Sequence, residues 1–274
     1  MKLARVFAAG AGALAAMPLG ALAQPAATGS ATPSSPAAWA AMDGVTIRLA
    51  LPSGAEAVPE AELPKLDLAG VEDAKISLRK GVRRLTASPD HLSDVVAAVC
   101  ATAPGARLPA EAVPIVLDKM GEMAKADTSK TTSIERFEDG VAAEALGRWE
   151  QSFALDGHLA AAGARLPVHA DGRRLVGFVG SGPEALVCAV VCTEVSLESA
   201  RVCPAVIASV RFEGAFVTPP RASFGGRVLF AAVRRPLPAA GALVGLLLFV
   251  AGLLTALIPP RRGRISSARG AGVP

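Results

Sequence analysis

Aromatic side chains are scarce in this 274-residue sequence, which contains no tyrosine, two tryptophans and nine phenylalanines. Sites that bind sugars or single-stranded nucleic acids usually use Trp and Tyr as stacking surfaces. The composition therefore argues against both kinds of ligand. Trp149, between Arg148 and Glu150 in an expected strand, is more typical of a half-buried core residue than of a ligand contact.

The sequence motifs of common enzyme classes are also missing. There is no His-Glu-x-x-His, no Gly-x-Ser-x-Gly, no Gly-x-Gly-x-x-Gly and no Walker-type phosphate loop. The histidines, His91, His158 and His169, are expected at surface or turn positions. Neighbouring carboxylates such as Asp156 and Asp171 do not by themselves make a catalytic triad. We therefore predict no catalytic residue, metal or cofactor, and an exported hydrolase with an unrecognised site is the alternative to a binding role.

Acidic residues are absent from both ends of the sequence. All 24 lie between Asp43 and Glu213, and the same stretch holds only 18 of the 28 basic residues, which leaves it a net charge of −6. The overall charge of +4 comes from basic residues near the termini. A nucleic-acid partner for the middle of the chain is therefore disfavoured.

The N-terminus has the pattern of a secretory signal peptide. Lys2 and Arg5 precede an apolar run over residues 6–19, and Ala21-Leu22-Ala23 supplies small residues for cleavage after Ala23. An uncleaved anchor is the alternative. Residues 24–40, rich in Ala, Pro, Ser and Thr, are expected to form a flexible linker.

Near the C-terminus, residues 236–260 carry no charge and have arginines on both sides. This run is long enough to cross a bilayer as a helix. Within it, Gly241, Gly245 and Gly252 are candidate positions for close helix packing. Residues 219–235 are expected to be juxtamembrane, with an amphipathic stretch over 227–233 along the membrane surface. A sorting tail that is later removed is the other interpretation.

Together these segments predict the topology. Because a signal peptide directs the downstream chain across the membrane, residues 41–218 should form a domain on the periplasmic or extracellular side of the cytoplasmic membrane. Residues 261–274 would then be a basic cytoplasmic tail of a single-pass protein. The predicted partners are the lipid bilayer, through the C-terminal helix, and either another envelope protein or a second copy of the chain.

The middle segment is predicted to be an α+β domain, an antiparallel sheet flanked by helices. Val45, Ile47, Leu49 and Leu51 alternate with other residues, as in a half-buried strand. Further strands are expected at 75–78 or on to 85, and at 132–137, 143–154, 173–180, 185–193 and 210–216. Turns are expected at Asp139-Gly140, Asp156-Gly157, Asp171-Gly172 and 180–183.

Three helices are expected between or after these strands. One begins at Ser88-Pro89 and carries Leu92, Val95, Val96 and Val99 at helical spacing. Another follows Pro114, with Val116, Leu117, Met120 and Met123 on one face. A short one follows Pro204.

The order of elements resembles the Mog1/PsbP-like α/β domains. The resemblance rests on VTIRLALP at residues 45–52 and VIASVRF at residues 206–212. It covers architecture over about two-thirds of the chain and transfers no functional residue. It implies a binding or assembly domain rather than a particular chemistry.

The cysteines are Cys100, Cys188, Cys192 and Cys203. In an exported domain they are expected to form disulfides. Cys188 and Cys192 lie four residues apart on one expected strand, about 13 Å, which is too far for a disulfide. Of the two remaining arrangements we favour Cys192 with Cys203 and Cys100 with Cys188, the second tying the helix at Leu92 to the sheet. A zinc site is the alternative, although paired Cys-x-x-Cys sequences are missing.

Overall fold

The structure is a computed structural model. It describes residues 36–42, 44–63, 75–103, 108–129, 132–145, 147–161, 164–180, 184–197 and 201–234. The expected signal peptide (1–23), membrane helix (236–260) and tail (261–274), with Gly241, Gly245 and Gly252, lie outside these residues. Within the described ranges, no helix has both the length and the apolar character needed to span a membrane.

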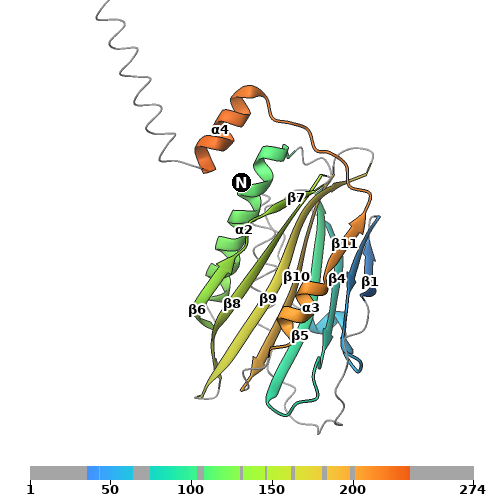
Figure 1. Ribbon diagram of the computed structural model, residues 1–274, viewed down its shortest axis with the longest axis vertical. Helices are drawn as coiled ribbons and strands as arrows, with labels where there is room; N and C mark the ends of the chain where they lie inside the picture. The colour runs from blue at the N-terminus through green and yellow to red at the C-terminus, as the bar shows by residue number, and fades with distance from the viewer. Residues whose placement is uncertain are drawn as a thin grey trace, which may run out of the picture. The chain divides into compact units, whose positions relative to one another are not determined.

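A large antiparallel sheet forms the centre of the domain, with the strand order β3-β4-β5-β10-β9-β8-β6 and with β7 paired to β8 (Figure 1). Its strands are β3 (Glu56–Val58), β4 (Lys75–Arg83), β5 (His91–Ala103), β6 (Thr132–Asp139), β7 (Ala143–Ala145), β8 (Arg148–Ala161), β9 (Ala164–Val179) and β10 (Glu184–Ser196). Neighbouring strands of this sheet pair antiparallel, so the α+β class predicted from the sequence is confirmed.

A smaller sheet and a short helix cover one face of the large sheet. The small sheet has the order β1-β2-β11, with β1 at Ala37–Met42, β2 at Val45–Leu49 and β11 at Arg211–Gly214. In β2, Val45, Ile47 and Leu49 are buried while the residues between them are half-buried, as the alternation predicts. Strand β1 begins at Ala37, inside the segment expected to be a flexible linker, because Ala40 and Met42 are buried in the core.

The opposite face of the large sheet is covered by α2 (Val113–Thr128), which lies along β6, β8 and β9 (Figure 1). Val113, Leu117 and Met120 of α2 pack against a group of sheet residues that includes Trp149 and Phe178. Trp149 is 3% exposed, in keeping with its expected place in the core. The helix after Pro114 is therefore confirmed.

The remaining helices are short. Helix α3 (Cys203–Ser209) lies where a short helix was expected, next to Pro204. The 3-10 turns η1 and η2 occupy Glu60–Glu62 and Ala110–Ala112. Helix α4 (Phe224–Arg234) begins a second compact unit.

The prediction of a helix after Ser88-Pro89 is wrong, because residues 91–103 form the strand β5. This strand lies between β4 and β10, and consecutive residues of it, which point to opposite faces of the sheet, are buried. Val96, Ala97, Ala98 and Ala101 are each at most 3% exposed. A strand buried on both faces has no alternation, and its apolar residues then also match a helical spacing.

Two of the expected turns are wrong as well. Asp156-Gly157 lies within β8 and Asp171-Gly172 lies within β9. A Cβ on Gly172 would come within 2.1 Å of the Phe153 ring, and one on Gly157 within 2.5 Å of the Ser133 carbonyl oxygen. These glycines therefore permit close approach of neighbouring groups and do not reverse the chain.

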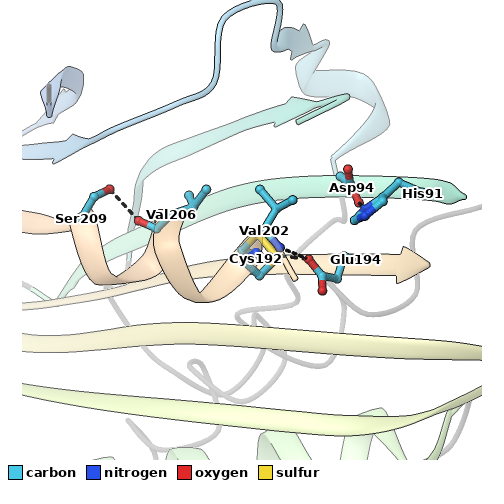
Figure 2. Close-up of a disulfide and its surroundings, with 8 residues drawn as sticks. His91, Asp94, Cys192, Glu194, Val202, Val206 and Ser209 are labelled. Carbon is cyan, nitrogen blue, oxygen red and sulfur yellow. Dashed lines mark hydrogen bonds and ion pairs between the residues drawn. A yellow bond between two sulfur atoms is a disulfide. The ribbon is translucent and has the colours of Figure 1, made fainter. Parts of the chain in front are cut away.

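Two disulfides link the elements of the core, and they join the two pairs favoured from the sequence. Cys100 on β5 and Cys188 on β10 lie directly opposite each other, with their Cα atoms 4.1 Å apart. Cys192 on β10 joins Cys203 at the first residue of α3 (Figure 2). The first bridge connects two central strands, and not a helix and a strand as expected. The second fixes α3 on the sheet.

Candidate functional site

An open hollow of about 720 Å³ lies on the large sheet beside α3. Its lining comes from β6, β8, β9 and α3, so residues far apart in the sequence meet there. The lining residues are Phe137, Glu138, Asp139, Gly140, Ser152, Phe153, Ala154, Asp171, Gly172, Arg173, Pro204, Ile207 and Ala208. The hollow thus combines carboxylates, a hydroxyl and a guanidinium with apolar surface, which is typical of ligand sites.

Asp171 is a half-buried carboxyl in this lining. Burial raises the pKa of its carboxyl, the neighbouring Glu194 raises it further, and the Arg201 guanidinium opposes both effects. Among the residues that the structure describes, none donates a hydrogen bond to this carboxylate. A half-buried carboxyl without a partner among the described residues is a group to which a bound ligand can donate hydrogen bonds.

The other polar groups of the hollow are held differently. Arg173 Nη1 donates a hydrogen bond of 2.7 Å to the Val210 carbonyl oxygen and lies 3.7 Å from Glu150 Oε2. Ser152 is exposed. The lining contains a hydroxyl and carboxylates but no histidine, so it does not supply the base that a serine nucleophile uses.

A row of polar residues crosses the large sheet beside the hollow. Strand register places Asp94, Glu194, His169, Asp156 and Arg136 as successive neighbours on β5, β10, β9, β8 and β6. His169 Nδ1 lies 2.8 Å from Asp156 Oδ1. This row was not predicted from the sequence, because its members come close only through pairing between distant strands.

The histidines therefore do not lie in turns. His169 pairs with Asp156 across two strands, and His158 Nδ1 lies 3.1 Å from Glu135 Oε1. The side chain of His91 is 3% exposed and lies 3.0 Å from Asp94 Oδ1. The expectation of a surface or turn position is therefore wrong for His91 and His169, whose side chains are 3% and 16% exposed, while the His158 side chain is 33% exposed.

One group of described residues could hold a metal ion. Donor atoms of His91, Asp94 and Glu194 lie within 4.8 Å of one another, and all three side chains are buried. Burial raises the pKa of the Asp94 carboxyl, and its contact with His91 opposes that rise. Glu194 Oε2 accepts hydrogen bonds from the backbone N–H groups of Val202 and Cys203, at 2.9 and 3.1 Å (Figure 2). Glu194 therefore has a structural role at the start of α3.

Arg174 lies on the other face of the sheet and is fully buried. Its Nη1 donates to Asp139 Oδ1 at 2.9 Å, and its guanidinium lies 4.2 Å from the centre of the Phe153 ring. Burial lowers the pKa of Arg174, and the Asp139 carboxylate opposes this effect. A Cβ at Gly121 of α2 would come within 2.1 Å of Asp139 Oδ2, so this glycine lets the helix approach the ion pair.

Asp156, a member of this row, should make the stability of the fold depend on pH in the acidic range. Burial raises the pKa of Asp156, but His169 and Arg201 together lower it below the ordinary value. A lowered carboxyl pKa adds stability above the unfolded value, near 4, and that stability is lost as the pH falls further. Asp156→Asn should therefore flatten the fall in melting temperature below about pH 4. Exposed Asp118→Asn is the control. If the melting temperatures of the wild type and of Asp156→Asn fall equally steeply with pH, the lowered pKa of Asp156 is contradicted.

The two buried disulfides, with no free cysteine among the described residues, indicate an exported protein, since disulfides persist in oxidising compartments. The zinc alternative is excluded by the same bridges.

Neither a protein-family model nor a curated protein matches the sequence. A solved structure, described as "Crystal structure of LpqN involved in cell envelope biogenesis of Mycobacterium tuberculosis", is similar over 65% of this chain and 89% of that one. The two are 14% identical, with a TM-score of 0.36. A similarity of that extent decides neither fold nor function, and the resemblance to Mog1/PsbP-like domains stays a prediction.

Proposed function

We propose that this chain is an envelope protein whose exported domain binds a ligand or a partner in the hollow beside α3. The observation that carries the proposal is the half-buried Asp171 carboxyl, to which no described residue donates a hydrogen bond, in a hollow of about 720 Å³. The disulfide at Cys203 fixes α3, one wall of this hollow, on the sheet. Such a preformed site does not have to be ordered by the ligand.

The place of the protein in the envelope is part of the same proposal. Residues 236–260 would anchor the domain at the outer face of the cytoplasmic membrane, with the tail 261–274 inside. The lack of charge in this run and the arginines beside it support the anchor. The lining of the hollow does not favour the hydrolase alternative.

A photo-crosslinking amino acid tests the hollow directly. Placed at Ala154, within the lining, it should give a discrete adduct in cells, detected as a mass shift of the intact protein. Asp171→Asn should lower the yield of this adduct about tenfold, because hydrogen bonds to a charged group contribute about 1.5–3 kcal/mol.

The control position is Glu122, which is exposed on α2 and lies outside the lining. Crosslinking from Glu122 should be weak and insensitive to Asp171→Asn. If Ala154 gives no more adduct than Glu122, the hollow is not a binding site.

A further inference from the structure

Helix α4 exposes most of its large apolar side chains. Phe224, Val228, Leu229 and Val233 are 75%, 54%, 61% and 57% exposed. Elsewhere in the described chain, the exposed large hydrophobic side chains are Val141 and Leu197. An apolar surface gathered on one helix marks an interaction site rather than scattered exposure.

The exposed side chains share one side of the helix. At about 100° per residue, Phe224, Val228, Leu229 and Val233 fall within about half of the circumference. Arg227 falls on the opposite side, and its guanidinium lies 6.0 Å from the centre of the Phe224 ring. The helix therefore has an exposed apolar half and an opposite half that carries Arg227 beside the half-buried Phe230, an arrangement that a helix in a membrane interface can use.

The charges around α4 indicate the chemistry of the partner. No acidic residue follows Glu213 in the sequence. Arg221 and Arg227 precede Arg234 and Arg235, and the uncharged run 236–260 begins directly after them. The partner should therefore have an apolar interior that can bury the exposed side chains and a negatively charged surface that attracts the arginines. An anionic bilayer has both properties.

We propose that α4 lies in the interface of an anionic bilayer, with Phe224, Val228, Leu229 and Val233 among the acyl chains and Arg227 at the headgroups. This inference rests on the proposed envelope location and uses no residue of the hollow. It gives the protein a lipid-binding element distinct from the expected anchor.

A fluorescent label on the full-length chain tests the proposal. Because the four native cysteines form disulfides, Leu229→Cys supplies a free thiol for an environment-sensitive dye. In vesicles of phosphatidylcholine with phosphatidylglycerol, brominated acyl chains should quench this dye severalfold more than the same dye at Val141→Cys. Val141 is 93% exposed in the first unit. Arg227→Gln should weaken the preference for phosphatidylglycerol about fivefold.

The outcomes separate this inference from the envelope proposal. A chain that floats with the vesicles while both dyes are quenched equally overturns the role of α4 alone. A chain that floats with neither anionic nor neutral vesicles overturns the membrane location as well. A concentration-dependent blue shift at Leu229→Cys without quenching by lipid would show that a second copy covers α4, and would also overturn the proposal. Gly225→Leu, in the apolar half of the helix and with open space around it, should strengthen quenching.

Discussion

Asp139→Asn should lower the free energy of unfolding by about 3–5 kcal/mol, because it leaves a buried guanidinium without its countercharge. The Arg174 side chain is 0% exposed and the Asp139 side chain is 26% exposed. Water can therefore reach the Asp139 carboxylate but not the Arg174 guanidinium. Arg174→Met should cost less, since the Asp139 carboxylate left behind can still be hydrated.

Chemical denaturation of the oxidised protein measures both effects. The double variant Asp139→Asn with Arg174→Met should be more stable than Asp139→Asn alone, since it removes the uncompensated charge. The neighbouring Glu138→Gln is a matched control, because Glu138 pairs with Arg136 at the surface and should matter little. Additive losses in the double variant would show that Arg174 and Asp139 do not act as a pair.

Removing the Cys100–Cys188 bridge should be the most destabilising change at the cysteines. Its cysteines are 88 residues apart, against 11 for Cys192–Cys203. On loop-closure entropy the two bridges contribute about 4.5 and about 3 kcal/mol. All four cysteines are buried, so paired alanine substitutions remove similar packing at both sites.

Thermal unfolding of the two paired alanine variants tests this order. The Cys100→Ala, Cys188→Ala variant should melt well below the Cys192→Ala, Cys203→Ala variant, and both below the wild type. The second variant should in addition lose adduct formation at Ala154, since α3 forms a wall of the hollow. Equal melting temperatures, or the reverse order, would contradict the role given to the longer loop.

The sequence predicted the elements whose pattern depends on one buried face. In β2 the alternation of Val45, Ile47 and Leu49 was sufficient, and α2 followed from its apolar spacing. The prediction was wrong at β5, because a central strand is apolar on both faces and Ser88-Pro89 also resembles a helix start. Local spacing alone cannot distinguish these cases, since the neighbouring strands supply the missing information.

A distance argument that needs only one correct strand reduced the possible cysteine pairings from three to two. With Cys188 and Cys192 both on β10, the pairs that remain include the ones observed. The hollow had no such local signal. The register of β8 and β9 places Asp171 opposite Ala154, and only the folded sheet brings it into one lining with α3, while its Asp171-Gly172 sequence resembles a turn. Strand register was therefore the information that the sequence did not provide.

Export of the domain to an oxidising compartment underlies both the proposed binding role and the proposed membrane contact. Its most direct test is mass-spectrometric mapping of the protein from its own cells, with thiols blocked at lysis and no reductant added. We expect no free thiol and two linked peptide pairs, Cys100 with Cys188 and Cys192 with Cys203. Four blocked, unlinked cysteines in the folded protein would place the domain in a reducing compartment and contradict its export.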